Sequence, residues 1–131
     1  KGILFIAHIG KFIKVSGGIM NTHSRNADAR AELMAAAALR AGADASLARG
    51  ILDTGTTEEA LDLLAEGDGE LYGRTMKEIC TKVQFYLDQH TRGSLETGAV
   101  LFSSVRGKLG ETETVPDLIR KINGQKERIH L

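Results

Sequence analysis

Residues 3–9 form a short apolar run, ILFIAHI, which is followed at once by a polar stretch that contains glycine. The run is rich in β-branched residues and apolar on both faces, a pattern typical of a buried, parallel β-strand. Open α/β sheets bind their ligands beyond the carboxyl ends of such strands. The sequence therefore predicts an α/β fold with a ligand site directly after this strand.

The first polar cluster contains His8, Gly10 and Lys11, and Lys14 follows one helical turn later. A glycine at this position would let the backbone approach a ligand, and a lysine would offer a positive charge to a carboxylate or phosphate. The alternative interpretation is a plain strand end with a surface lysine. The spacing matches neither a phosphate-binding P-loop nor the GxGxxG motif of dinucleotide-binding folds.

The second polar cluster is a run of five residues: Asn21, Thr22, His23, Ser24 and Arg25. Thr22 or Ser24 is expected to cap a helix that runs to about Ala41. The free N–H groups at a helix N-terminus, together with His23 and Arg25, would suit an anionic group such as a carboxylate. The alternative is a capping segment with solvated side chains. Ser24 and His23 are adjacent in sequence, so they do not indicate a catalytic triad.

The rest of the chain alternates helical and strand patterns. Helices are predicted over about 44–52, 57–65, 68–90 and 114–122, a helical turn over 11–16, and a strand with a hairpin arm over 99–103 and 108–110. Glu58 and Glu59 are both assigned to a capping box rather than to acid–base chemistry. Cys80 falls on the apolar stripe of the long helix and is expected to be a buried structural thiol. The tail from Gly124 is expected to fray.

These elements predict one α/β domain over residues 1–131, with a small parallel or mixed sheet flanked by helices. The chain between the two main strands would pack on one face of the sheet as a Rossmann-like layer. A chain of 131 residues is long enough for a real hydrophobic core. Because Lys1 stands directly before a strand, we expect the chain to be a fragment of a longer protein, and a further strand could precede it.

Composition narrows the classes of function. Seventeen Lys and Arg residues balance 17 Asp and Glu residues, which gives no support for a nucleic-acid or membrane-surface partner. The single cysteine excludes an internal disulfide, and no apolar run suits a membrane span or a signal peptide, so we expect a cytoplasmic protein. The four histidines lack metal-ligand spacing, and no metal site is expected.

The two clusters and their flanking segments resemble the signature region of the CbiD family. Residues 7–44 contain HIGK, GGIMNTHSR and DAR in the order and spacing of the family, and residues 56–64 and 98–110 resemble later segments. The resemblance implies a cobalt-precorrin-5B (C-1)-methyltransferase of anaerobic cobalamin biosynthesis. It also implies S-adenosylmethionine as methyl donor, with cobalt present only within the corrin substrate. This chain would be the carboxyl-terminal domain of a two-domain protein.

On this resemblance, His23 and His8 would be catalytic and could relieve the ring of a proton. The expected substrate-binding residues are Gly10, Lys11, Lys14, Asn21, Thr22, Ser24 and Arg25. The expected partners are the cobalt–corrin precursor and an amino-terminal domain, and a homo-oligomer stays open. Two alternatives remain: a non-catalytic ligand-binding or interaction module whose partner domain carries the chemistry, and an unrelated small nucleotide-binding α/β domain.

Overall fold

A computed structural model describes residues 1–22 and 28–130, and for residues 125–130 it describes the backbone alone. The chain forms a three-stranded sheet with helices between and after the strands. The elements in chain order are β1 (Gly2–His8), α1 (Ile9–Phe12), the short 3₁₀ helix η1 (Val15–Gly17), α2 (Arg30–Arg40), α3 (Ala45–Leu52), α4 (Thr57–Glu66), α5 (Gly69–Thr91), β2 (Glu96–Ser103), β3 (Gly107–Glu111) and α6 (Val115–His130).

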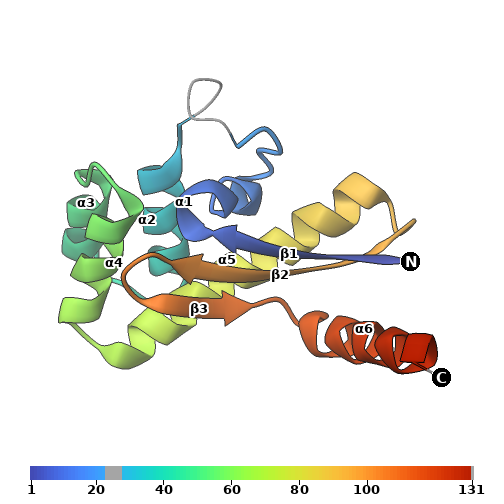
Figure 1. The fold of residues 1–131 in the computed structure, drawn as a ribbon. Helices are drawn as coiled ribbons and strands as arrows, with labels where there is room; N and C mark the ends of the chain where they lie inside the picture. Colours follow the sequence, from blue (N-terminus) through green and yellow to red (C-terminus); the bar gives the residue numbers. More distant parts are fainter. Residues whose placement is uncertain (23–27, 131) are drawn as a thin grey trace.

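The sheet has the order β1-β2-β3, with β1 parallel to β2 and β3 antiparallel to β2. His8 pairs with Phe102, so the carboxyl ends of the two parallel strands meet at one edge of the sheet (Figure 1). The predicted α/β class, the small mixed sheet and the hairpin arm are confirmed. Within the described residues, five α-helices and one 3₁₀ turn connect the parallel strands, one more α-helix than the sequence patterns indicated.

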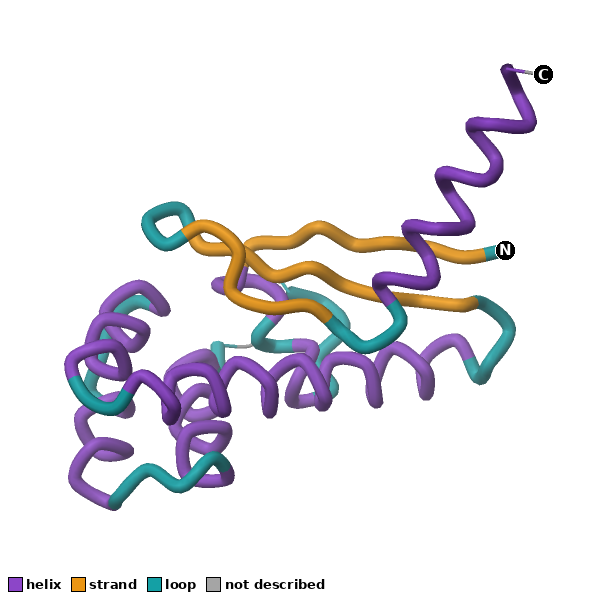
Figure 2. The backbone as a smooth tube through the Cα atoms, turned by 90° about the horizontal axis from the view of Figure 1, so that it is seen from below, coloured by secondary structure: helices purple, strands orange, loops and turns teal. Residues whose placement is uncertain are grey.

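The helices between the parallel strands pack on one face of the sheet, and α6 leaves from the other side (Figure 2). The largest fully buried side chains of the core are Ile9, Ile13, Met34, Ile51, Leu61, Leu64, Ile79, Val83 and Leu101. Three alanines of α2, at positions 35, 37 and 38, are also buried. Their small side chains let α2 pack closely against α3 and α5, as the alanine-rich sequence predicts.

The expectation that the first strand is buried on both faces is wrong, although its parallel pairing is confirmed. Ile6 is 70% exposed and Ile3 is 42% exposed. Strand β1 lies at the edge of the sheet: the crossover helices cover the face of Ile3 only in part, and α6 covers the opposite face, that of Ile6, only near Gly2. An apolar pattern records which residues avoid water, but it does not say which neighbouring element covers them.

Two predicted helix ends differ from the structure. Helix α2 begins at Arg30, well after Thr22, and its N-cap residue Ala29 makes no side-chain capping bond. Asp28 pairs with the Arg30 guanidinium instead, at 2.9 Å, and this hydrogen bond lowers the pKa of the Asp28 carboxyl. Helix α6 continues to His130 rather than ending near residue 122. Strong helix formers after Gly124 (Gln, Lys, Glu, Arg) offset the cost of about 1 kcal/mol of the glycine.

Gly98 lies where α6 crosses the sheet, and its replacement tests that packing. A methyl group there would lie 2.8 Å from Oγ1 of Thr114 and 2.9 Å from Cδ1 of Leu118. We therefore expect Gly98→Ala to lower the free energy of unfolding by about 1–3 kcal/mol. Gly73→Ala, at an open position inside α5, should raise it by about 0.5–1 kcal/mol. Chemical denaturation measures both, and equal effects would contradict the docking of α6 on β2.

Candidate functional site

An open cleft of about 640 Å³ lies where β1 ends, beside the start of α4. Six residues that the sequence assigned to a site line it: His8, Gly10, Lys11, Lys14, Asn21 and Thr22. The other three predicted residues, His23, Ser24 and Arg25, lie outside the described residues. A smaller cavity of about 250 Å³ shares Arg30, Thr56 and Thr57 with this cleft, so the two are neighbours.

The parallel register explains why distant segments meet here. Because His8 pairs with Phe102, the residue that follows β2, Ser104, lies beside the end of β1. The Nε2 atom of His8 is 3.1 Å from Oγ of Ser104. Helix α4 contributes its N-terminus to the same edge. Three parts of the chain thus surround the cleft.

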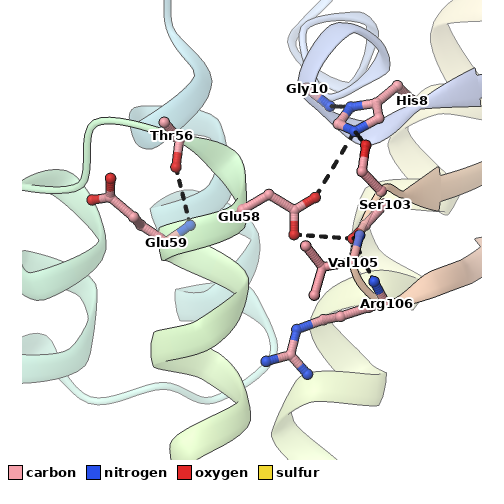
Figure 3. A network of polar contacts seen from close by, with 9 residues as sticks. His8, Gly10, Thr56, Glu58, Glu59, Ser103, Val105 and Arg106 are labelled. Carbon is pink, nitrogen blue, oxygen red and sulfur yellow. Dashed lines mark hydrogen bonds and ion pairs between the residues drawn. The ribbon is translucent and has the colours of Figure 1, made fainter.

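His8 has a defined orientation and a defined tautomer. Its Nδ1 accepts a hydrogen bond of 3.0 Å from the backbone N–H of Gly10, which assigns the proton of the neutral ring to Nε2. The ring also lies edge-on to Phe102, with 5.5 Å between the ring centroids. Nε2–H therefore points away from α1 toward Ser104 and Glu58 (Figure 3). In this state the ring can donate a hydrogen bond but has no uncommitted basic nitrogen.

Gly10 lets this corner of the site pack tightly. A β-carbon there would lie 3.1 Å from Nδ1 of His8 and 3.3 Å from Oγ1 of Thr57. Side chains at these distances leave little room for even a methyl group, so glycine allows β1, α1 and α4 to meet. The sequence indicates a glycine suited to close approach, and in the structure the approaching groups are His8 and Thr57.

The two lysines of the first cluster occupy different environments. Lys11 is exposed, whereas Lys14 is only 1% exposed. The Nζ atom of Lys14 donates a hydrogen bond of 3.0 Å to the backbone carbonyl of Thr22. Within residues 1–22 and 28–124 no ion pair to this ammonium group forms, although its charge contributes to the lowered pKa of the Asp28 carboxyl. A buried cation without a close anion is costly to the fold, which makes Lys14 a prominent group of the cleft.

The capping assignment is right for Glu59 and wrong for Glu58. Oγ1 of Thr56 accepts a hydrogen bond of 3.2 Å from the N–H of Glu59, and the Glu59 carboxylate accepts one of 3.2 Å from the N–H of Gly55. The Glu58 carboxylate instead turns toward the sheet, where its Oε2 accepts a hydrogen bond of 3.0 Å from Ser103 (Figure 3). Neighbouring side chains on a helix point in different directions, so only one of the two can reach back to the cap.

Ser103 holds the Glu58 carboxylate in place. The Ser103 hydroxyl is buried and accepts hydrogen bonds from the backbone N–H groups of Val105, at 3.2 Å, and Arg106, at 2.9 Å. Its own proton is thereby free to go to Glu58. The second carboxylate oxygen, Oε1, lies 3.9 Å from Nε2 of His8. The turn after β2 thus fixes a carboxylate beside the histidine at the end of β1.

The sequence missed five residues of the described lining: Arg30, Thr56, Thr57, Glu58 and Ser104. One usable signal was the end of the second strand, since parallel strands end at the same edge and bring Ser104 next to His8. The capping pattern at Thr56 correctly located the start of α4, but nothing in it indicated that this start faces the cleft. Long-range placement of this kind depends on how the helices pack.

Other candidate groups of the chain are structural. Burial, with a smaller effect of the Glu111 charge, raises the pKa of the Cys80 thiol to about 11, so the group stays protonated at neutral pH. The expectation that Cys80 is a buried structural thiol is confirmed. In the described part of the chain, no cluster of three or more His, Cys, Asp or Glu side chains could hold a metal ion. None of the described helices is long and apolar enough to cross a membrane.

Comparison with known proteins shows similarity to one protein family. The model of the family "CbiD, C-terminal domain" matches residues 21–113. A cobalt-precorrin-5B C(1)-methyltransferase of Alkaliphilus metalliredigens is 35% identical over 123 residues, which cover 94% of this chain and 32% of that protein. Proteins of the same name from Listeria monocytogenes and Clostridioides difficile are each 37% identical, over 92% and 91% of this chain.

The matches cover nearly all of this chain but only part of each relative. The chain spans about a third of the length of the curated relatives that it matches. No solved structure matches it. The family model covers more than half of the chain, including Asn21, Thr22 and the start of α4. The chain therefore belongs to the CbiD family and corresponds to the C-terminal domain of its members.

Proposed function

We propose that this chain serves as the carboxyl-terminal domain of a cobalt-precorrin-5B C(1)-methyltransferase, and that its cleft binds part of the corrin substrate. One observation carries the proposal: six residues named from the family signature gather in one cleft at the carboxyl edge of the parallel strands. That edge is where open α/β folds bind ligands. The reaction in this proposal is the one named for the relatives, and the cleft is the region of this chain where we expect the substrate to bind.

The charges of the cleft suit a substrate that carries several carboxylates. Its described lining contains three cationic side chains, Lys11, Lys14 and Arg30, of which Arg30 is paired with Asp28, and one acidic side chain, Glu58. Lys11 is exposed and can meet a carboxylate as it arrives, whereas the buried Lys14 can hold one at the base of the cleft. His23, Ser24 and Arg25 stay predicted members of the site.

The methyl donor in this proposal is S-adenosylmethionine, whose sulfonium supplies an electrophilic methyl group. The smaller cavity beside the cleft supports the presence of two ligands side by side, because methyl transfer needs donor and acceptor in contact. Arg30, Thr56 and Thr57 belong to both cavities and would contact both ligands. His8, with its proton on Nε2, is suited to orient an acceptor by donating a hydrogen bond.

The test is turnover in a full-length CbiD protein that carries this domain. His8→Ala and Lys11→Ala should each reduce methyl transfer to cobalt-precorrin-5B about a hundredfold, because each removes a positioned polar contact. The matched controls, His90→Ala and Lys77→Ala, change exposed side chains on α5 and should leave turnover unchanged. Circular dichroism checks that all four variants fold. Unchanged turnover in both site variants would remove these residues from the site.

A second candidate function is that of a non-catalytic binding or interaction module. The edge strand β1 favours it, since Ile6 and, on the opposite face of the strand, Ile3 expose apolar surface. Titration of this chain with S-adenosylhomocysteine and with a tetrapyrrole separates the two candidates. Binding of either ligand supports the catalytic domain, whereas binding of neither, together with self-association, supports the interaction module. In both cases the isolated chain is expected to show no methyl transfer.

A further inference from the structure

Glu58 stands apart from the other groups of the cleft. It is the only acidic side chain in the described lining, which otherwise contains lysines, an arginine and neutral polar groups. Its Oε1 atom is buried and has no hydrogen-bond donor among residues 1–22 and 28–124. An uncommitted buried acceptor is uncommon in native proteins and calls for an explanation in function.

The position of this carboxylate is set by the fold rather than by solvent. Ser103 donates a hydrogen bond of 3.0 Å to Oε2, and Ser103 is itself held by two backbone N–H groups of the following turn. Glu58 lies in the first turn of α4, whose start is fixed by Thr56 and Glu59. One carboxylate oxygen is therefore anchored, while the other lies buried without a donor among the described residues, 3.9 Å from Nε2 of His8 (Figure 3). A catalytic group needs such support to be held in a productive geometry.

The neighbouring titratable groups are poorly suited to accept a proton. The Nδ1 atom of His8 is already the acceptor for the Gly10 N–H, so protonation there would break that bond. Lys14 donates to the Thr22 carbonyl as an ammonium group. The groups that face Glu58 from other elements are His8 at the end of β1, Tyr72 on α5 and Arg106 in the β2–β3 turn. In the described lining, the Glu58 carboxylate is the acidic group with an oxygen, Oε1, that accepts no hydrogen bond from the described residues.

We propose that Glu58 is the general base of the cleft and accepts the proton that methylation releases. This inference rests on the proposed function. Transfer of a methyl cation from a sulfonium breaks the S–C bond, forms a C–C bond at the acceptor carbon and leaves a neutral thioether. The acceptor thereby gains one unit of positive charge, and loss of one ring proton to the Glu58 carboxylate offsets it. The carboxylate becomes a neutral acid, and solvent takes the proton up after product release.

The adjacent residues Glu58, the proposed base, and Glu59, a helix-capping residue, provide the test. In a full-length CbiD protein, Glu58→Gln keeps the size and the hydrogen bond to Ser103 but removes the base. We expect its kcat for methylation of cobalt-precorrin-5B to fall at least a hundredfold. Glu59→Gln, which changes an exposed capping residue, should keep kcat within about threefold. The KM values should change little in either variant, because the proposed role concerns the chemical step.

The pH profile of kcat separates a base from a structural residue. The kcat of the wild-type protein should fall along an acidic limb, and the residual kcat of Glu58→Gln should lack that limb. Glu58→Asp keeps the base on a shorter side chain, so it should retain the limb with an intermediate kcat. Full kcat in Glu58→Gln, or a loss of equal size in Glu59→Gln, would overturn the inference while leaving the proposed function in place. A wild-type protein with no methyl transfer would overturn the proposed function itself.

Discussion

Replacement of Lys14 with methionine is expected to stabilise this domain and to weaken its binding of an anionic substrate. The Lys14 side chain is 1% exposed, and its ammonium group has one hydrogen bond, to the Thr22 carbonyl, within the described residues. Methionine has a similar length and no charge to desolvate. We therefore expect the free energy of unfolding to rise by about 1–3 kcal/mol, somewhat less than the range seen when whole buried ion pairs give way to apolar side chains, because the Thr22 carbonyl loses a hydrogen bond.

The same substitution should raise the KM for cobalt-precorrin-5B by about 30-fold or more. Loss of one partner from a buried charge pair costs about 2 kcal/mol or more of binding free energy. Lys77→Met, which changes an exposed lysine on α5, is the matched control and should alter neither quantity by more than about 0.5 kcal/mol. Steady-state kinetics and thermal unfolding of the full-length protein measure both effects. A destabilised Lys14→Met variant with normal KM would instead identify Lys14 as a structural residue.

Leu61→Ala is expected to give the largest loss of stability among the single changes considered. Leu61 lies on α4, is fully buried, and belongs to the core that joins the helices to β2. Its truncation removes apolar contacts and leaves a cavity, so the free energy of unfolding should fall by about 2–5 kcal/mol. Because Leu61 lies one turn after Thr57 and Glu58, we also expect the start of α4 to shift at the cleft and substrate binding to weaken.

Leu39→Ala provides the comparison for this prediction. Leu39 has the same side chain on helix α2 but is 51% exposed, so its truncation should change the free energy of unfolding by less than about 0.5 kcal/mol. Urea denaturation of the two variants gives both values. Similar effects for Leu61 and Leu39 would mean that α4 is not seated in the core as described.

Local signals in the sequence were sufficient for most of the fold. The apolar runs at 3–9 and 99–103 became the parallel strands, and the capping residues Asp44, Thr56 and Asp68 each begin a helix. These features depend on hydrogen bonds within a few residues, which a sequence pattern reports directly. Of the predictions that were wrong, those for Ile6 and Glu58 depend on distant neighbours, whereas the start of α2 and the end of α6 differ in local helix boundaries.

In the candidate site, too, local features could be predicted from the sequence and long-range contacts could not. His8, Lys11 and Thr22 were named from a signature of residues close together in the chain, and they do line one cleft. Glu58 was assigned to capping, because a capping box is a complete local explanation for two adjacent glutamates. Its actual partner, Ser103, is 45 residues away and reaches it only because α4 packs at the end of β2.

The sequence by itself determined which segments become strands and helices, and that polar residues cluster directly after the first strand, because those properties arise from periodicity, capping and turn residues. Only the tertiary structure decided that Lys14 is buried while Lys11 is exposed, that Ile6 of β1 stays exposed, and that Glu58 faces His8. The physical reason is that burial, charge pairing and proton-accepting capacity are set by atoms from other elements, whose positions follow from packing rather than from any local pattern.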